Sequence, residues 1–303
     1  MGNSRNSYLI KNTMIFTLGN LGSKLISFFL IPLYTNALTT TEYGVVDLIA
    51  TVGTVAAPVL TLNTCESVMR FALDKDANKD KITQIGTNLL LIGMVVGLVI
   101  FPICHSFNRI SQYSVFVYFY VISLAASQLY LCDLRGKELL VYYSIGNVLH
   151  TFFIAALNIL FLVVFKGGIE GYLNAYIIAN ILTATYALIM GKGYRSFSFS
   201  GVDKKLLQRM IRYSIVLIPN SFMWWIMNSS DRVMVSSMVG IAANGIYAVS
   251  YKLPTLVSTL TTIFNQAWSY SAIREEGTED ENEYNNKIFR TLIGIVMLIG
   301  IGL

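Results

Sequence analysis

The sequence contains little charge: Asp, Glu, Lys and Arg together make up 13% of its 303 residues. Soluble domains usually carry about 25% charged residues. Hydrophobic residues take the place of the missing charge and reach 54%, and the mean hydropathy is +0.59. Because apolar runs of about 20 residues recur along the whole chain, the composition predicts many membrane spans rather than a soluble protein with one large core.

Cysteine is also scarce, which excludes two further kinds of structure. Cys65, Cys104 and Cys132 all lie in or at the ends of apolar segments. An odd number of cysteines in such places indicates neither a disulfide framework nor a metal motif. The N-terminal apolar segment is too long for the core of a signal peptide and lacks a small-residue cleavage site, so we interpret it as an uncleaved first span.

Eight segments are long and apolar enough to cross a membrane. They cover residues 13–36, 45–64, 84–104, 113–132, 141–165, 171–190, 213–236 and 244–268. A ninth span begins near Phe289 and stops at Leu303, after about 22 Å of a roughly 30 Å hydrocarbon core. The sequence therefore predicts a chain that ends inside a span, as a fragment of a longer protein would.

The Lys and Arg residues alternate between the two sides of this layout. Almost all of them lie in the N-terminus or in the connections on its side, whereas only Arg109 and Lys166 lie in the opposite connections. Cytoplasmic loops carry the excess of Lys and Arg in membrane proteins. This pattern predicts a cytoplasmic N-terminus, and it explains the net charge of +5 without a nucleic-acid partner.

Three cations lie within the spans, namely Lys24, Arg232 and Lys252. A charge there costs about 2.5–3.5 kcal/mol and usually has a function. Stripes of polar residues at helical spacing accompany them on spans one, seven and eight, and span two carries a similar stripe from Asp47 to Cys65. Hydroxyl stripes alone are typical of helix–helix contacts. Because packing does not need the charges, we favour a water-filled central cavity between these four spans.

Span pairs one–two and seven–eight resemble each other, because each consists of two polar-striped helices joined by a short outward turn. Gly44 and Gly245 are the glycines of these turns. The repeat predicts two lobes with a site between them, as in many transporters. We place the N-terminal lobe at residues 1–195, with spans one to six, and the start of the C-terminal lobe at residues 196–303.

Two stretches resemble polysaccharide-export flippases, the Wzx-type O-antigen transporters. They read NTMIFTLGNLGSKLISFFLIPLYTNALTTTEYGVVDL and IPNSFMWWIMNSSDRVMVSSMVGIAANGIYAVSYKLPTLVSTLTTIFNQAW. The resemblance covers essentially the whole chain and is strongest at LTTTEYG, SDR and GIYAVSYK. It implies an all-α integral membrane protein of the MOP superfamily, with two pseudo-symmetric helical lobes that move by alternating access and a truncated second lobe.

The resemblance also implies the cargo, an undecaprenyl-diphosphate-linked oligosaccharide repeat unit for O-antigen or capsule assembly. This lipid-linked oligosaccharide would be moved from the cytoplasmic to the periplasmic leaflet of the bacterial inner membrane. The other partners we expect are membrane lipids and the polymerase and chain-length proteins of the same pathway. We expect no enzymatic activity, no metal and no cofactor, apart from H⁺ or Na⁺ as a coupling ion.

Nine residues receive roles from these considerations. Cations would compensate the diphosphate and amides would meet the sugar, which gives a predicted substrate-binding set of Lys24, Lys252, Arg232, Arg70, Asn20 and Asn228. Buried carboxylates would exchange the coupling ion or pair with cations, which gives Asp47, Asp231 and Glu66.

Each role has a structural alternative. Lys24 would form an ion pair with Asp47 or Asp231, Arg232 would snorkel to the interface or be neutralised by its neighbour Asp231, and Arg70 would be a positive-inside anchor. Three functional alternatives also remain open. They are a cation-coupled multidrug exporter of the same superfamily, a membrane-embedded polysaccharide polymerase or ligase, and a non-transporting subunit. The short outward connections leave no room for the catalytic loop of a polymerase.

Overall fold

The structure is a computed structural model that describes residues 26, 29–74, 76–105, 111–198, 201–252, 254–255, 258, 290, 293–294 and 297. The chain divides into two compact units, Met1–Ile246 and Tyr247–Leu303. Each unit is described here by itself. The lobe boundary expected between residues 195 and 196 stays a prediction.

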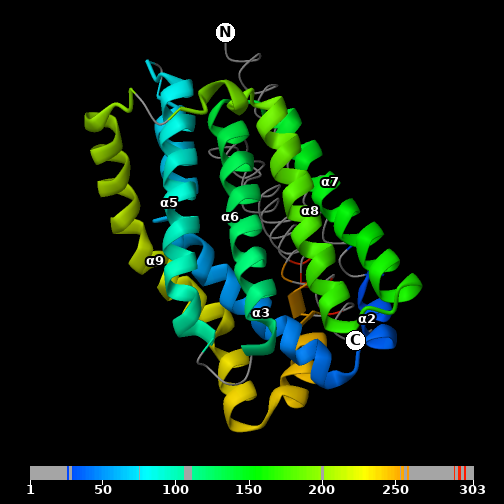
Figure 1. The fold of residues 1–303 in the computed structure, drawn as a ribbon. Coiled ribbons are helices and arrows are strands. Elements are labelled where there is room, and N and C mark those ends of the chain that lie inside the picture. Colours follow the sequence, from blue (N-terminus) through cyan, green and yellow to red (C-terminus); the bar gives the residue numbers. More distant parts are fainter. Residues whose placement is uncertain are drawn as a thin grey trace. The chain divides into compact units, whose positions relative to one another are not determined.

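All regular elements in the described part of the first unit are helical, as the sequence predicted (Figure 1). The α-helices are α2 (Ile31–Ala37), α3 (Thr40–Leu60), α4 (Thr64–Ala72), α5 (Lys79–His105), α6 (Ser114–Gly136), α7 (Leu140–Asn158), α8 (Gly168–Met190) and α9 (Lys204–Met238). Short helical segments are η1 (Ser111–Tyr113), the π-helix η2 (Ile159–Val164) and η3 (Gly193–Ser196).

Five of these helices are long and apolar enough to cross a membrane. They cover Thr40–Leu60, Lys79–Ile100, Ser114–Gly136, Leu140–Val164 and Gly168–Met190, which agrees with predicted spans two to six. Helix α9 contains predicted span seven and has 35 residues, which is long enough, but it is less apolar than these five. Predicted spans one, eight and nine lie largely outside the described residues.

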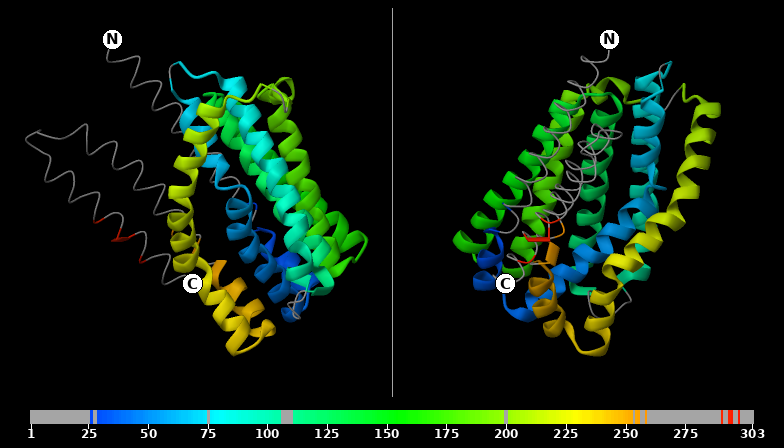
Figure 2. Two further views of the ribbon diagram at one scale, coloured as in Figure 1. Left: turned by 60° about the vertical axis from the view of Figure 1, so that its left-hand side comes forward. Right: turned by 180° about the vertical axis from the view of Figure 1, so that it is seen from behind.

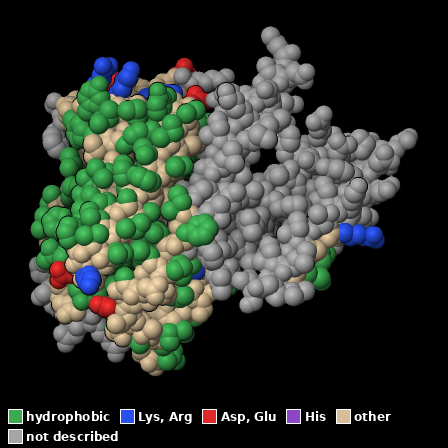
Figure 3. All heavy atoms as spheres, turned by 90° about the vertical axis from the view of Figure 1, so that its right-hand side faces the viewer, with side chains coloured by type: hydrophobic (Ala, Val, Ile, Leu, Met, Phe, Trp, Pro, Cys, Tyr) green, Lys and Arg blue, Asp and Glu red, His purple; other side chains and the backbone are tan. Residues whose placement is uncertain are grey.

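Helix α6 lies at the centre of the first unit and packs against α3, α4, α5, α7 and α8. Helices α5, α6, α7 and α8 run side by side, and α9 packs against α3 and α4 (Figures 1 and 2). Leu134 and Leu173 are almost completely buried in this core, whereas Val99 and Phe152 are exposed. Hydrophobic side chains cover the middle of the face in Figure 3, and charged side chains gather toward its ends. An apolar girdle between charged ends suits a lipid bilayer.

A buried ion pair fixes one end of this core. Lys137 Nζ lies 2.7 Å from Asp133 Oδ2, with the two side chains only 8% and 3% exposed. Asp133 Oδ1 accepts a 2.6 Å hydrogen bond from Thr83 Oγ1 of α5, and Lys137 Nζ donates to the Gly191 carbonyl after α8 at 2.9 Å. Both charges are thus compensated, as a buried pair requires, and α5, α6 and α8 are tied together.

Predicted span two is not one continuous helix. Helix α3 ends at Leu60, and Leu62 and Asn63 both adopt a positive φ of 52° before α4 begins at Thr64. Asparagine tolerates this left-handed conformation, whereas leucine rarely adopts it. The Asn63 Nδ2 atom donates to Ser221 Oγ of α9 at 3.1 Å. The predicted stripe from Asp47 to Cys65 on a single helix face is therefore wrong beyond this break.

The absence of a disulfide was also a wrong expectation. Cys65 of α4 and Cys132 of α6 form a disulfide, 67 residues apart in the sequence. An odd count of cysteines does not exclude one disulfide, because two of the three can pair. The bond attaches α4 to the central helix of the unit.

The described residues of the second unit are also helical. Residues 247–252 form helix, and the Thr255 Oγ1 atom donates to the Tyr251 carbonyl at 2.8 Å, one turn back along the chain. The rings of Tyr247 and Tyr251 lie 6.0 Å apart between centroids. Predicted span eight continues beyond these residues, outside the described part of the chain.

Candidate functional site between helices α3 and α9

The start of α3 is fixed by a capping box in the segment TTTEYG. Thr39 Oγ1 accepts from the Glu42 amide at 3.3 Å, and Glu42 Oε2 accepts from the Thr39 amide at 2.8 Å. Such reciprocal bonds satisfy amides that the first helical turn leaves unpaired. They set the position of Asp47, which lies about two turns into the helix.

Asp47 forms a buried ion pair with Arg232 of α9. Arg232 Nη1 lies 2.7 Å from Asp47 Oδ1, and the two side chains are 17% and 7% exposed. The sequence analysis assigned Arg232 to the cargo and Asp47 to ion coupling or charge pairing, and the structure brings the two together. Trp225 of the same helix donates from Nε1 to the Thr51 carbonyl at 2.9 Å, one turn further along α3.

Asn244 is a further partner of the carboxylate. Its Nδ2 atom donates to the Gly44 carbonyl at 3.1 Å and lies 3.4 Å from Asp47 Oδ2. Asn244 is fully buried and belongs to a helix that begins at residue 241. Sequence reasoning missed this residue, although it precedes Gly245, which the comparison of span pairs had singled out.

Gly44 and Gly245 allow the two helix starts to touch through their backbones. A Cβ atom on Gly44 would collide with the carbonyl oxygen of Ile241, and one on Gly245 would collide with that of Thr40. Both glycines lie inside helices rather than in the turns where the sequence analysis placed them. Both glycines lie at one close backbone crossing, in which any side chain would force the helices apart.

A cluster of tyrosines lies close to the ion pair of Asp47 and Arg232. The rings of Tyr172 and Tyr176 stack with centroids 4.6 Å apart, and Tyr34 meets Tyr172 edge-on at 5.2 Å. Tyr120 and Tyr176 lie close enough to Asp47 to interact with its charge. Tyr43 also interacts with this charge, so three tyrosines lie near the buried carboxylate.

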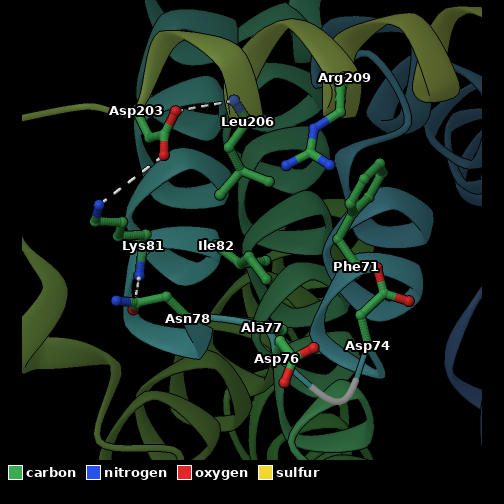
Figure 4. A pocket seen from close by; sticks show the side chains of 10 residues that line it. All are labelled: Phe71, Asp74, Asp76, Ala77, Asn78, Lys81, Ile82, Asp203, Leu206 and Arg209. Atoms are coloured by element: carbon green, nitrogen blue, oxygen red, sulfur yellow. Dashed lines mark hydrogen bonds and ion pairs between the residues drawn. The ribbon is translucent and has the colours of Figure 1, made fainter.

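A pocket of about 500 Å³ lies near the first turns of α9, between α4, α5 and the connection that joins them (Figure 4). Lys81 Nζ lies 3.9 Å from Asp203 Oδ2, and Asp203 caps α9 by accepting from the Leu206 amide at 3.1 Å. This hydrogen bond, together with the charge of Lys81, lowers the pKa of Asp203. The Arg209 guanidinium points into the pocket (Figure 4).

The other predicted site residues are spread over the chain. Arg70 of α4 pairs with Asp74 at 2.6 Å, and both side chains are about half exposed, at 53% and 54%. Glu66 is exposed on the same helix. Asn228 is exposed on α9 and donates to the Trp224 carbonyl at 2.7 Å. None of these contacts connects them with Asp47.

Asp231 is half-buried, and its Oδ1 atom accepts from the Arg232 backbone amide at 2.9 Å. The Arg232 guanidinium instead pairs with Asp47. Lys252 is half-buried in the second unit, and Lys24 and Asn20 lie outside the described residues. Their cargo-binding roles, and the central cavity predicted between spans one, two, seven and eight, stay predictions.

Comparison with known proteins identifies the family. Residues 9–270 match the model of the family described as polysaccharide biosynthesis protein. The chain belongs to this family. The resemblance to MOP-superfamily polysaccharide-export proteins is thereby confirmed, whereas no curated protein matches the sequence.

Solved structures show that this polysaccharide biosynthesis protein has the MOP transporter fold. The inward-facing and outward-facing structures of a multidrug resistance MATE transporter of the MOP superfamily both give a TM-score of 0.57, at 17% and 12% identity. They cover 95% and 94% of this chain, which in turn covers 68% and 77% of theirs. A MOP superfamily transporter from Pyrococcus furiosus, described as having a binding pocket of reverse polarity, gives 0.53 at 14% identity, over 88% of this chain and 70% of its own.

These likenesses establish the fold, and the family adds its role in polysaccharide biosynthesis. The protein is a multi-pass membrane protein of the MOP transporter type. The identities of 12–17% are too low to transfer a substrate from the neighbours.

Proposed function

We propose that this protein flips undecaprenyl-diphosphate-linked oligosaccharide repeat units across the bacterial inner membrane, for O-antigen or capsule assembly. The N-terminus lies in the cytoplasm, and the cargo passes from the cytoplasmic to the periplasmic leaflet. The pathway's polymerase and chain-length proteins are the protein partners in this proposal. Family membership and the MOP fold support a transporter of polysaccharide precursors.

The observation that carries the proposal is the ion pair between Asp47 and Arg232. It joins the second and seventh predicted spans, which belong to different halves of the predicted repeat. Alternating access requires such contacts to form in one state and to separate in another. The backbone crossing at Gly44 and Gly245 lies beside the pair, so both would close the same end of the transport path.

Arg232 also supplies the chemistry that a diphosphate cargo needs. A guanidinium binds phosphate oxygens with paired hydrogen bonds, and it keeps its charge at every physiological pH. In the structure this group donates to the Asp47 carboxylate. Separation of α9 from α3 would release the guanidinium from Asp47, so that the cargo anion replaces the carboxylate as its partner.

A cation-coupled multidrug exporter is the second candidate, because two of the structural neighbours are multidrug resistance MATE transporters. Such a site needs uncompensated negative charge for a cationic drug. Asp47 is the buried carboxylate of the α3–α9 contact, and Arg232 already balances its charge. The local electrostatics therefore favour an anionic cargo.

The test is transport by the full-length protein in proteoliposomes, with a lipid-linked oligosaccharide and a cationic dye as alternative substrates. We expect flipping of the oligosaccharide and no dye efflux. Arg232→Gln should reduce flipping by about tenfold or more, the effect of losing a charged hydrogen bond, and Arg232→Lys should restore part of it. Arg195→Gln, which removes an arginine outside the α3–α9 contact, is the matched control. Dye efflux without oligosaccharide flipping would replace the proposal with the exporter.

A further inference from the structure

The pocket in Figure 4 lies at the depth of the lipid headgroups. Its lining includes Lys81 near the start of α5 and Arg209 near the start of α9. Lys81 precedes the apolar segment 84–104 by three residues, and Arg209 precedes the segment 213–236 by four, which is about 4.5 and 6 Å along a helix. The polar layer on each side of the hydrocarbon core is about 5–7 Å thick. Both cations therefore lie where lipid phosphates lie.

Two of the carboxylates that line the pocket already have a cation beside them. Asp74 pairs with Arg70 at 2.6 Å, and Asp203 Oδ2 lies 3.9 Å from Lys81 Nζ. These four charges cancel in pairs. They give neither a purely anionic nor a purely cationic ligand an advantage.

Asp76 and Arg209 are the other two charges that line the pocket. Neither forms a hydrogen bond or an ion pair with another residue in the part of the chain that the structure describes. Arg209 projects into the pocket from α9, whereas Asp76 belongs to the connection between α4 and α5 (Figure 4). Both are exposed and can be reached from solvent. A ligand between them would meet one positive and one negative group.

Apolar side chains form another part of the pocket wall. Ile82 and Leu206 are buried, and the Phe71 ring, which also lines the pocket, meets Tyr213 edge-on at 5.9 Å between centroids. The pocket volume of about 500 Å³ lies in the range of about 300–1,000 Å³ that is usual for ligand sites. The wall thus suits a ligand whose charged groups are joined by short hydrocarbon segments.

We propose that this pocket binds a phosphoethanolamine group, the zwitterionic headgroup of an aminophospholipid. The phosphate oxygens accept from Arg209, and the primary ammonium donates to Asp76. A choline headgroup has no N–H donor for Asp76, and a glycerol headgroup has no positive charge. The depth of the pocket favours a lipid over soluble phosphoethanolamine. The bound headgroup connects α9 with the α4–α5 connection, whatever cargo the protein transports.

Lipid binding to the full-length protein in detergent tests this site. Native mass spectrometry measures the affinity for phosphatidylethanolamine, phosphatidylcholine and phosphatidylglycerol with identical acyl chains. We expect phosphatidylethanolamine to bind about fivefold more tightly than either of the others, the effect of one partly exposed charge pair. Soluble O-phosphoethanolamine and inorganic phosphate are the arms without a lipid tail, and both should bind more weakly than the lipid.

Charge-specific variants separate this site from the general lipid surface. Arg209→Gln should weaken the binding of all three lipids about fivefold, because each carries a phosphate. Arg209→Lys should recover part of the loss. Arg212→Gln is the matched control, since Arg212 is exposed on the same helix and does not line this pocket.

Asp76→Asn should remove the preference for phosphatidylethanolamine and should not weaken the binding of phosphatidylglycerol. Its control is Glu138→Gln, which removes an exposed carboxylate outside the pocket and should keep the preference. This pattern distinguishes a contact with the ammonium group from a structural role, which would affect all three lipids alike.

Equal affinities for the three lipids overturn the proposal, and so does an Arg209→Gln variant that binds them as Arg212→Gln does. Soluble O-phosphoethanolamine that binds as tightly as the lipid would support the zwitterion site and assign it to a soluble ligand. Inorganic phosphate that binds as tightly as phosphatidylethanolamine would overturn the zwitterion, because the ammonium group would then contribute nothing.

Discussion

Two ion pairs are buried in the described part of the first unit, and their connections differ. Asp133 of α6 and Lys137, the residue directly after α6, lie four residues apart; Asp133 accepts a hydrogen bond from Thr83 of α5, and Lys137 donates one to the Gly191 carbonyl just after α8. Asp47 and Arg232 lie 185 residues apart on α3 and α9. The first pair is surrounded by one helical bundle, whereas the second joins helices from the two halves of the predicted repeat.

The difference shows that a buried ion pair can lie within one rigid part of the core or can join two helices that are able to separate. The pair on α6 remains intact as long as α6 is helical, since both partners move together. The α3–α9 pair depends on the relative position of two helices, and its Arg232 side chain is the most exposed of the four, at 17%. Water can therefore reach Arg232 if the helices separate, which lowers the cost of breaking this pair.

The largest expected effect on stability concerns the ion pair between Asp133 and Lys137. Lys137→Met leaves Asp133 buried without its cation and should destabilise the protein by about 3–5 kcal/mol, measured by chemical denaturation in detergent. The double variant Lys137→Met with Asp133→Leu should recover much of this loss. Arg70→Met, in an exposed pair, is the control and should cost about 0–1 kcal/mol. Equal losses for Lys137→Met and Arg70→Met would contradict the comparison.

A smaller effect is expected for the contact between α3 and α9. Gly44→Ala introduces a methyl group against the Ile241 carbonyl and should weaken the crossing by about 1–3 kcal/mol. The distance between spin labels on the exposed residues Thr41 of α3 and Val239, just after α9, should lengthen. Gly97→Ala on α5 meets side chains and no backbone atom, the Tyr118 ring at 3.2 Å and Leu60 Cδ1 at 3.6 Å, and should leave this distance unchanged. An unchanged distance in Gly44→Ala would mean that the crossing does not determine the contact.

The smallest effect concerns the exposed end of α9. Because the pKa of Asp203 is lowered, mainly by the Leu206 amide, its capping contributes stability above the normal carboxyl pKa and loses it as the pH falls through the lowered one. Hydrogen exchange at Leu206 should therefore quicken in acid, relative to the intrinsic rate. In Asp203→Asn, which caps without a charge, the rate ratio should stay constant. A similar acid response in that variant would assign the effect to another group.

Spans two to six were predictable because each depends on a local property, a run of apolar residues about as long as the bilayer is thick. The capping box at Thr39 and Glu42 is also encoded in four consecutive residues. The family likeness rested on long quoted stretches and was confirmed by the match over residues 9–270. Local patterns thus supplied the fold class and most helices of the first unit.

The site depends on contacts that no local pattern contains. Arg232 and Asp47 received separate roles because 185 residues lie between them. The role of Asn244 depends on which way its amide faces, and the disulfide depends on the packing of α4 against α6. The equivalent positions of Gly44 and Gly245 in the two span pairs were the one sequence signal that pointed to this contact.

The interruption at Leu62 and Asn63 separates α3 from α4 mechanically. A continuous helix would transmit any tilt of α3 to α4, whereas non-helical residues absorb such a rotation in their backbone angles. The disulfide between Cys65 and Cys132 holds α4 against α6. A tilt of α3 therefore leaves α4 in its place.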